Sequence, residues 1–375
     1  MTAHHPIAIV GAGLGGLTLA RVLHVNGVEA AVFDLDAGPH ARRQGGVLDI
    51  HEDSGQAALA AAGLMDPFQQ IIHPGAEAMR VYDRHGFLHH EDSGEIGRPE
   101  VSRGDLRDLL LNSLPAGTVR WGAKAVAVRP LHGGRHEVTL ADGTAFTTDL
   151  LVGADGAWSR VRPLVSAAAP VYSGLSFVEV RIEDARNRYP DSFDLLSPGL
   201  TFALDDGRGL LSHREPDGTL EVYAALRTPA DWAGSIDFSA PDTVKKLLLE
   251  RFDGWDARLR ALIERADGEL VPRPIHALPV GHRWDRVPGV TLLGDAAHLM
   301  SPFAGEGANL AMLDGAQLAT ALVAHPGEVE AALAAYEAAL FPRSEQSAAQ
   351  SAANLELCFA PDAPQGLLDM FAQLG

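Results

Sequence analysis

The fold is decided near the N-terminus, by the stretch IAIVGAGLGGLTLARVLHVNGVEAAVFDLD at residues 7–36. Residues 7–10 form a short β-rich run, a glycine-rich turn follows, and residues 17–28 carry apolar side chains at helical spacing. A second β-rich run covers residues 29–36. This order predicts a β-turn-α-β unit, and therefore an α/β domain at this end of the chain.

The turn has the glycine spacing of a dinucleotide-binding loop. Gly11, Gly13 and Gly16 form G-x-G-x-x-G, in which the first glycine permits a tight turn and the third allows close packing. The second glycine lets the backbone approach a pyrophosphate, which the N–H groups at the helix start favour. Asp34 follows Gly16 by 18 residues, where a carboxylate can bind an adenosine ribose diol. The alternative is a plain βαβ turn with a solvated aspartate.

A second glycine-containing segment, LLGDAAHLMSPFAGEGAN, covers residues 292–309. Asp295 ends an aliphatic run and is placed to hold the ribityl hydroxyls of a flavin. The small residues of 302–307 leave room for backbone to lie against a flat ring, and a helix beginning near residues 308–309 directs its positive end there. Such an arrangement stabilises the negative charge of reduced flavin. The alternative is a strand followed by an ordinary helix-capping loop.

The bulk composition restricts the class of protein. A chain of 375 residues is long for one domain and suggests two. Its net charge of −19 argues against a nucleic-acid partner, because phosphate binding needs a basic surface. The single cysteine, Cys358, excludes an intramolecular disulfide and a thiolate metal cluster and fits a reducing cytoplasm. The 16 histidines show no H-E-x-x-H pattern, so no metal site is predicted, and no apolar run is long enough to span a bilayer.

The pattern of elements changes twice along the chain. After residue 166, scattered strands with polar turns predict a separate, largely antiparallel sheet, and after residue 328 the sequence is alanine-rich and helical, with Pro342 as a kink or break. We therefore expect three parts. The predicted ranges are 1–75, 101–165 and 270–327 for a cofactor domain, 76–100 and 166–269 for a substrate domain, and 328–375 for a C-terminal helix.

Three ordered motifs carry a resemblance to a known family. GAGLGG, DLLVGADGAWSRVR and GDAAHLMSPFAGEGAN resemble the flavin-dependent aromatic hydroxylases of the para-hydroxybenzoate hydroxylase type, the group A monooxygenases, over nearly the whole chain. Within that family, RQGGVLDIH, RGDLRDLLLNSL, RFDGWDARLRALI and GDAAHLMSPFAG are similar to the tetracycline-inactivating monooxygenases. The resemblance implies an α/β fold: a Rossmann-like FAD-binding domain, a mainly antiparallel-sheet substrate domain and a long C-terminal helix, without a separate NADPH domain.

The resemblance also assigns cofactor contacts position by position. Along the FAD molecule, the matching positions are Gly11, Gly13, Gly16 and Asp34 at the adenosine-pyrophosphate end, Arg103 and Arg107 as FAD-contacting arginines, Asp155 and Gly156 near the pyrophosphate, Gly45, Gly46 and Asp49 beside the flavin, and Asp295, Pro302, Gly305, Gly307, Ala308 and Asn309 at the flavin end. Arg42 matches an arginine tied to NADPH, although Arg42 and Arg43 can equally be read as solvated surface charges.

Departures from the family occur at the implied substrate pocket. Glu179 and Glu221 stand where the tetracycline-inactivating enzymes carry a glutamine and a histidine. Phe303 and Asn354 match pocket positions, and Cys358 stands in place of a methionine. Two added carboxylates change which substrate groups are accepted, and this puts tetracycline itself in doubt.

The resemblance implies an FAD-dependent monooxygenase that takes a hydride from transient NADPH or NADH and reacts with O2 to form a flavin C4a-hydroperoxide. The oxygen would pass to an electron-rich aromatic or polyketide, tetracycline-like, small molecule. Neither an acid nor a base side chain is strictly required, so no catalytic residue is named. We further expect a cytoplasmic monomer without a nucleic-acid or membrane partner. The alternatives are a non-catalytic FAD-binding protein and a flavin halogenase, which the absence of W-x-W-x-I-P disfavours.

Overall fold

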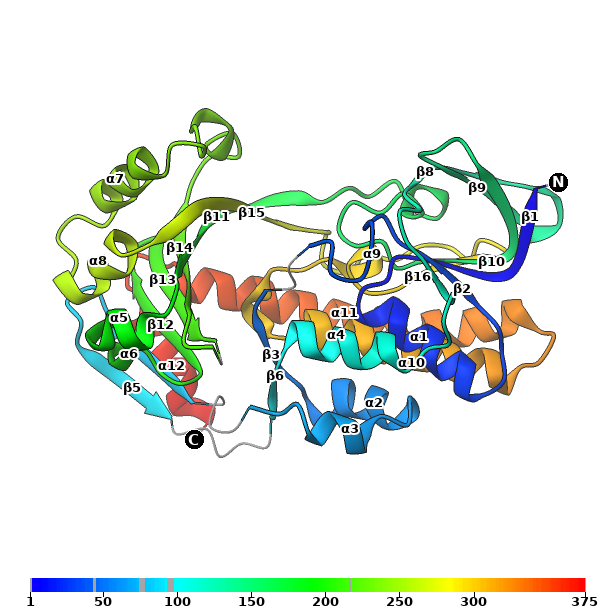
Figure 1. Cartoon of the computed structure of the whole chain (residues 1–375), viewed down its shortest axis with the longest axis horizontal. Coiled ribbons are helices and arrows are strands. Elements are labelled where there is room, and N and C mark those ends of the chain that lie inside the picture. Colours follow the sequence, from blue (N-terminus) through cyan, green and yellow to red (C-terminus); the bar gives the residue numbers. More distant parts are fainter. Residues whose placement is uncertain (1, 43–44, 74–77, 93–97, 216, 375) are drawn as a thin grey trace. The chain divides into compact units, whose positions relative to one another are not determined.

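The computed structural model describes residues 2–42, 45–73, 78–92, 98–215 and 217–374 (Figure 1). The chain divides into two compact units. The first comprises Met1–Ile72, Arg103–Val171 and Ala277–Ser351, and the second comprises His73–Ser102, Tyr172–His276 and Ala352–Gly375.

The first unit is built on a sheet whose central strands are parallel. The parallel set is β7 (Val119–Arg120), β2 (Ala31–Phe33), β1 (Ala3–Val10), β10 (Ala145–Gly153) and β16 (Val290–Leu292). The first half of β10 also pairs antiparallel with β9 (His136–Leu140), which pairs with β8 (Ala125–Pro130). Residues 8–10 and 150–153 are buried, as expected for the central strands of a sheet covered on both faces.

Helices and short turns of the first unit complete this α/β arrangement. The elements are α1 (Leu14–Val25), β3 (Val47–Asp49), the π-helix η1 (Glu52–Gln56), α2 (Ala57–Ala61), α3 (Met65–Gln69), α4 (Arg103–Asn112), the 3-10 turns η2 (His132–Gly134), η3 (Arg162–Leu164) and η5 (Pro302–Ala304), α9 (Asp295–His298) and α10 (Gly307–Ala324). Helix α11 (Val329–Cys358) follows, and α12 (Gln365–Leu374) ends the chain.

Helices α1 and α10 touch backbone to backbone through two glycines. A Cβ atom on Gly315 would lie 2.4 Å from the carbonyl oxygen of Gly15, and one on Gly15 would lie 2.6 Å from the carbonyl oxygen of Ala311. Real Cβ atoms do not approach backbone this closely, so only glycine permits the contact. Because α1 starts at the first glycine motif and α10 at the second, this contact fixes the two helix starts relative to each other.

The second unit is a seven-stranded sheet covered on one face by helices. Its order is β15 (Asp267–Ala277), β11 (Val171–Ile182), β14 (Leu220–Arg227), β13 (Arg208–Arg214), β12 (Leu200–Asp205), β4 (Met79–Asp83) and β5 (Leu88–Asp92), and only the β12–β4 pair is parallel among the pairs that the described residues give. The remaining elements are β6 (Glu100–Ser102), α5 (Ala185–Arg188), α6 (Pro190–Leu195), the turn η4 (Ala233–Ser235), α7 (Pro241–Arg251) and α8 (Ala257–Glu264).

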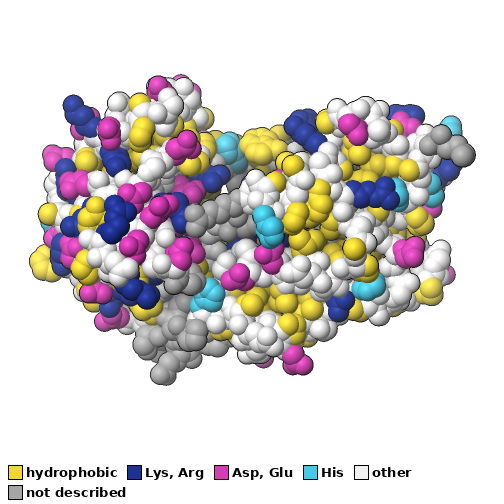
Figure 2. Space-filling view, viewed as in Figure 1, with side chains coloured by type: hydrophobic (Ala, Val, Ile, Leu, Met, Phe, Trp, Pro, Cys, Tyr) yellow, Lys and Arg dark blue, Asp and Glu magenta, His cyan; other side chains and the backbone are white. Residues whose placement is uncertain are grey.

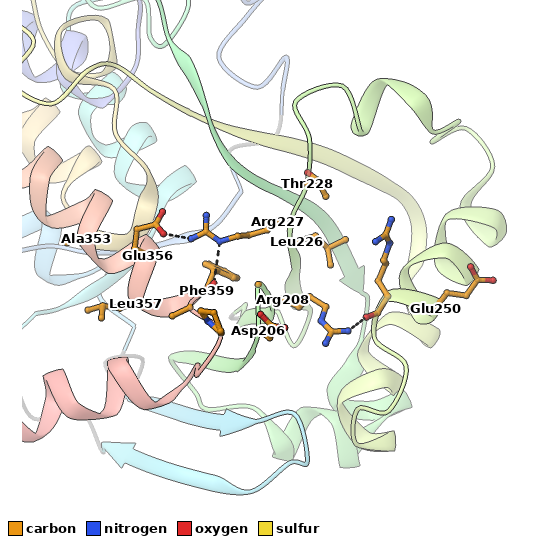
Figure 3. A pocket seen from close by; sticks show the side chains of 14 residues that line it. Asp206, Arg208, Leu226, Arg227, Thr228, Glu250, Ala353, Glu356, Leu357 and Phe359 are labelled. Carbon is orange, nitrogen blue, oxygen red and sulfur yellow. Dashed lines mark hydrogen bonds and ion pairs between the residues drawn. The ribbon is translucent and has the colours of Figure 1, made fainter.

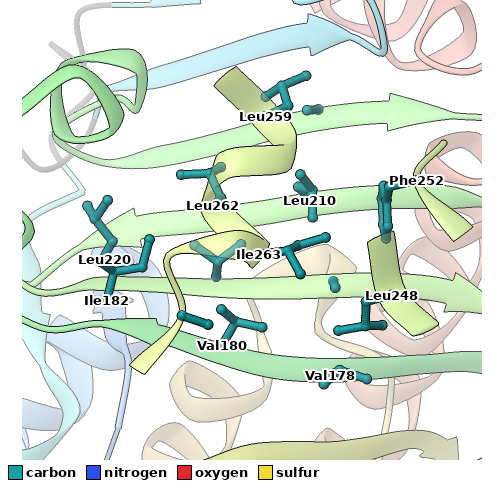
Figure 4. Close-up of a cluster of buried hydrophobic side chains, with 14 of the residues drawn as sticks. Val178, Val180, Ile182, Leu210, Leu220, Leu248, Phe252, Leu259, Leu262 and Ile263 are labelled. Carbon is teal, nitrogen blue, oxygen red and sulfur yellow. The ribbon is translucent and has the colours of Figure 1, made fainter. Parts of the chain in front are cut away.

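Strand alternation separates the two faces of this second sheet. Val178, Val180 and Ile182 point to the same side of β11 and pack with Leu248 and Leu262 from α7 and α8 in one buried cluster (Figure 4). The intervening positions of β11 therefore lie on the opposite face, where the side chains are polar or aromatic. One face of the sheet thus forms the core, and the other carries the polar and aromatic side chains.

The expected fold is confirmed in class and in its main parts. The first unit is α/β, the second sheet is mainly antiparallel, and a 30-residue helix, α11, follows residue 328. Pro342 lies inside α11 without ending it, so of the kink or break predicted at that residue the break is wrong. The helix has 13 residues before Pro342 and 16 after it, and their hydrogen bonds outweigh the one that proline removes.

Replacing Gly315 by alanine tests the helix contact. We expect Gly315→Ala to lower the free energy of unfolding by about 1–3 kcal/mol, because the new methyl group forces α1 and α10 apart. Gly38→Ala is the matched control, since a Cβ there meets no described atom within 4 Å, and its effect should stay within about 0.5 kcal/mol. Urea denaturation measures both. Equal stability of the two variants would contradict the close contact.

Candidate functional site

The first glycine motif forms a tight loop between β1 and α1. Gly11 has φ +111°, and a Cβ there would lie 2.1 Å from the carbonyl oxygen of Ala154, while one on Gly16 would lie 2.1 Å from that of Gly11. Gly13 differs, because a Cβ on it meets no described atom within 4 Å. Gly13 is also the N-cap residue of α1, and no described side chain caps that helix start. The loop therefore presents free N–H groups and an open backbone surface suited to a phosphate group.

Asp34 and Arg107 organise this loop from two sides. Asp34 is 5% exposed, and its carboxylate accepts hydrogen bonds from the N–H groups of Ala12 (2.6 Å) and Asp36 (2.8 Å). Arg107 is 2% exposed and donates to the carbonyl oxygens of Ala12 (3.2 Å) and Pro39 (2.6 Å). Its Nη2 atom has no hydrogen-bond partner among the described residues, 4.0 Å from Asp36 Oδ2. A buried cationic donor without a full set of partners suits an anionic ligand beside the loop.

The Asp155-Gly156 turn follows the neighbouring strand, β10. The carboxylate of Asp155 accepts from Ser159 Oγ (2.5 Å) and from the backbone N–H of Arg160 (2.7 Å), and burial raises its pKa. Gly156 has φ +77° and open space where a Cβ would stand, judged by the described atoms. Arg162, which the sequence analysis missed, donates to the carbonyl oxygens of Ala296 (2.8 Å) and Asp295 (3.2 Å) and so ties this turn to the second glycine segment.

In the second glycine segment, a few exposed residues stand among buried ones. Residues 290–294 and 296–298 are buried, whereas the side chain of Asp295 is exposed. Pro302 and Gly305 are exposed as well, and Gly305 has φ +68°. Helix α10 begins at Gly307, one residue before the predicted start, and no described side chain caps it. Asp295 and the 302–307 segment are thus available to a ligand, as is the start of α10.

Asn309 joins this segment to β3. It is 1% exposed; its amide nitrogen donates to the carbonyl oxygen of Asp49 (2.8 Å), and its amide oxygen accepts from the N–H of His51 (3.0 Å). The side chain of Asn309 is therefore a buried structural link between the two segments. His51 and Glu306 take part in the same link and were not anticipated from the sequence.

His298 lies in a buried ion-pair cluster. Its Nε2 atom lies 2.6 Å from Asp314 Oδ2, and Arg343 donates to the other oxygen of Asp314 (2.7 Å). Burial alone would lower the pKa of His298, but the Asp314 carboxylate raises it. Both His298 and Asp314 are almost fully buried. This geometry suits a structural histidine rather than a base that contacts a substrate.

The remaining predicted cofactor residues of the first unit lie between β2 and α4. Arg42 is exposed and donates from Nε to Asp36 (2.9 Å), so it is paired and still accessible; Arg43 lies outside the described residues. Gly45 is exposed, and Gly46 has φ +90° and accepts a hydrogen bond from the N–H of Arg103 (3.0 Å). The start of α4 is thereby attached to the segment that leads into β3.

The predicted substrate residues fall in both units. Phe303 belongs to the first unit and is half-buried, whereas Asn354 and Cys358 lie four residues apart on α11 within the second. Cys358 is buried, and burial raises the pKa of its thiol to about 12. Glu179 on β11 accepts from Arg273 Nη2 (2.9 Å).

Glu221 stands at the centre of a polar cluster on the face of the second sheet opposite the apolar cluster of Val178, Val180 and Ile182. On its two flanking strands it is opposite Arg181 and His213. It accepts a hydrogen bond from the hydroxyl of Tyr223. One imidazole nitrogen of His213 and one carboxylate oxygen each of Glu215 and Glu221 lie within 4.8 Å of one another. Burial, assisted by the charge of Glu221, raises the pKa of Glu215 to about 7. The cluster can therefore gain or lose one proton near neutral pH, and it can accept hydrogen bonds from a ligand.

A separate hollow of about 1170 Å³ lies on the second unit (Figure 3). Arg227 there donates to Glu356 (2.7 Å), and Arg208 donates to the carbonyl oxygen of Arg251 (2.7 Å). None of the glycine-motif residues lines this hollow. Because these arginines are already paired within the protein, the hollow is not assigned a ligand.

No helix in the described part of the chain is both long and apolar enough to cross a membrane.

The fold and the glycine loops define a dinucleotide-binding protein of the oxidoreductase class. Comparisons with known proteins agree. The sequence pattern of the family described as "FAD binding domain" matches residues 4–192 and 256–351. The chain is 31% identical to monooxygenase penA of Penicillium thymicola, over 96% of each protein.

Two solved structures show the same fold. Klebsiella pneumoniae HpxO, crystallised with FAD and uric acid, superposes with a TM-score of 0.80 at 23% identity, over 99% of this chain and 92% of HpxO. The tetracycline destructase Tet(51) gives a TM-score of 0.73 at 19% identity, over 100% of this chain and 96% of that one.

The chain belongs to this FAD-binding family, of the para-hydroxybenzoate hydroxylase type. It is an FAD-dependent monooxygenase that uses a reduced nicotinamide nucleotide and O2.

Gly13 and Gly16 give a pair of variants that separates folding from cofactor binding. Gly13→Ala should leave stability within about 0.5 kcal/mol, since its Cβ meets no described atom and its φ of −77° suits alanine, but the methyl group intrudes on the phosphate surface. We expect its Kd for FAD to rise at least about tenfold. Gly16→Ala should instead lose stability, because its Cβ collides with the carbonyl oxygen of Gly11. Thermal unfolding of each variant and quenching of FAD fluorescence measure the two effects. Unchanged FAD affinity in Gly13→Ala is the contradictory result.

Proposed function

We propose that the first unit holds FAD along one line of residues. The loop from Gly11 to Gly16 would receive the pyrophosphate, with Arg107 beside it, and Asp34 would retain lone pairs for the ribose. Asp155 and Gly156 would flank the pyrophosphate, and Asp295 the ribityl chain. The observation that carries this proposal is that a Cβ on Gly13 or on Gly156 would meet no described atom within 4 Å, and that Asp295 is exposed between buried neighbours.

The flavin ring would lie against the second glycine segment. Its contacts would come from Asp49, Gly45, Gly46 and Arg103 on one side and from residues 302–309 on the other. When bound, FAD supplies the hydride acceptor and the oxygen-transfer chemistry. The chain's own residues bind the cofactor, direct the start of α10 at the ring and keep bulk water from the reacting atoms. None of them needs to donate or remove a proton, so the proposal names no catalytic residue.

The proposed substrate is an electron-rich aromatic or enolic polyketide molecule with hydrogen-bond donors. Glu179, Glu221, Phe303, Asn354 and Cys358 are the proposed contacts. Glu221 supports this choice, because it is buried and one of its oxygens has no hydrogen-bond partner among the described residues. A carboxylate favours hydroxyl, amide or amine groups and disfavours a second carboxylate. Uric acid, which is bound in the HpxO complex, is an example of such a donor-rich ring.

The reductant and cellular context are also part of the proposal. Arg42, exposed beside Asp36, would contact the phosphate groups of NADPH or NADH. We propose a cytoplasmic monomer, since the one cysteine is buried and free. The net charge of −19 argues against a nucleic-acid partner, and on the left part of the face shown in Figure 2 basic side chains lie among acidic ones.

Anaerobic stopped-flow reduction tests the proposed function directly. The purified holoprotein is mixed with NADPH alone, and then with NADPH and each member of a panel of phenols, hydroxylated heterocycles and polyketides. A true substrate should speed flavin bleaching and, with O2 present, give product in proportion to the NADPH consumed. Protein that binds FAD but shows no compound-dependent reduction would support the non-catalytic alternative instead.

The proton on Glu215 in this polar cluster predicts that the KM for substrate depends on pH. Since the pKa of Glu215 is raised to about 7, its carboxyl group should lose its proton between about pH 6 and 8 and become a better acceptor. The KM for a donor-rich substrate should therefore fall over that interval, and Glu215→Gln should remove the change. Glu264→Gln, at an exposed carboxylate on α8, is the control. Steady-state kinetics from pH 5.5 to 8.5 measure it, and a KM step that persists in Glu215→Gln would contradict this role.

A further inference from the structure

We infer that His51 is a positioning residue for the flavin end of the site: its imidazole fastens β3 to the segment that precedes α10. The inference rests on the proposed FAD site. It adds a residue that belongs to neither glycine motif and whose side chain is directed at protein groups. Its effect on the cofactor would therefore pass through the segment it holds.

The contacts of His51 span the two segments. The ring is buried, with its side chain 7% exposed. Nε2 lies 2.8 Å from Asp49 Oδ2, and Nδ1 lies 3.2 Å from Glu306 Oε1. The backbone N–H of His51 donates to Asn309, which itself donates to the carbonyl oxygen of Asp49. The ring and the Asn309 amide thus form two neighbouring links between the same segments, the end of β3 and the start of α10.

This geometry requires a positively charged ring. Ionised carboxylates only accept hydrogen bonds, so a ring with a carboxylate at each nitrogen must donate from both, and only the imidazolium can do so. Hydrogen bonds to Asp49 and Glu306 outweigh burial and raise the pKa of His51 to about 9. Glu52 and Asp53, the next residues along the chain, are exposed. The two bonds are charge-assisted at neutral pH and stronger than neutral ones.

The fastened segment is the one proposed to meet the flavin. Glu306 is the N-cap residue of α10, and a Cβ on Gly305 would lie 3.5 Å from either carboxylate oxygen of Asp49. Without the ring's charge, Asp49 and Glu306 would face each other as two carboxylates and repel. The 302–307 segment would then move away from β3, and the start of α10 would no longer be held in a fixed orientation. A neutral substitute at position 51 should therefore loosen the cofactor without removing any group that touches it.

The sign of the pH dependence follows from the raised pKa of His51. A group whose pKa is raised by folding contributes its full stabilisation below its ordinary pKa near 6.5, and this is lost as the pH rises through the folded value of about 9. Retention of FAD should accordingly fall between about pH 8 and 10. A residue that merely filled space would give no such transition.

The experiment follows FAD release from the holoprotein after dilution, by the return of flavin fluorescence, from pH 6.5 to 10. In the unaltered protein we expect release to accelerate as the pH passes about 9. His51→Gln should release FAD about tenfold faster at pH 7.5 and show no further acceleration above it. Glu306→Gln should shift the transition to lower pH. His132→Gln, at an exposed histidine of the same unit, should behave like the unaltered protein.

NMR titration of the ring resonances gives a second readout, independent of cofactor loading. A histidine signal that is absent from His51→Gln should titrate near pH 9 in the unaltered protein. Should His51→Gln fail to fold, Glu306→Gln and the unaltered protein still decide the question. The inference is overturned if His51→Gln keeps the pH transition, or if the His51 ring titrates near 6.5. Failure of the unaltered protein to bind FAD at any pH would instead contradict the proposed cofactor site, on which this inference rests.

Discussion

The contact on which the rest of the site depends is the meeting of α1 and α10 at Gly15 and Gly315. Any larger residue at either position would place a side-chain carbon closer than 3 Å to backbone of the other helix. Each helix begins at a glycine motif, so their contact sets the distance between two positive helix ends. A dinucleotide is long and carries its charge at the pyrophosphate in the middle and, once reduced, at the flavin ring. Two helix starts held by a rigid backbone contact match that distribution of charge.

Buried charges surround this contact and hold the loops that carry the motifs. Arg107 fixes the first glycine loop, Arg162 attaches the Asp155 turn to the Asp295 segment, and Asp314 holds Arg343 and His298 together. Each of these charges is paired or donates to backbone carbonyls, as burial demands. The same principle operates at His51, where two carboxylates share one ring. Among the described residues of the first unit, these buried polar groups therefore serve to hold backbone in place.

The sequence predicts the local motifs well because their physics is local. The spacing of Gly11, Gly13 and Gly16 follows from one turn and one helix start, and strand alternation separates the two faces of the second sheet. Contacts between residues far apart in the sequence are not predicted by local patterns. Nothing near His51 in the chain indicates Glu306, and nothing near Arg162 indicates Asp295, since these pairs form only when the sheet brings distant segments together. Asp34 shows the same limit: its predicted role as a ribose acceptor gave no sign that it also caps the Ala12 amide.

The central claim is that one FAD molecule lies along the two helix starts, with its pyrophosphate against residues 11–16 and its ring against residues 302–307. A crystal structure of the FAD-loaded protein tests this most directly. The account predicts continuous density between those two segments, with phosphate oxygens within hydrogen-bond distance of the N–H groups that open α1. FAD bound with one-to-one stoichiometry but seated elsewhere, or leaving the start of either helix uncovered, would contradict it.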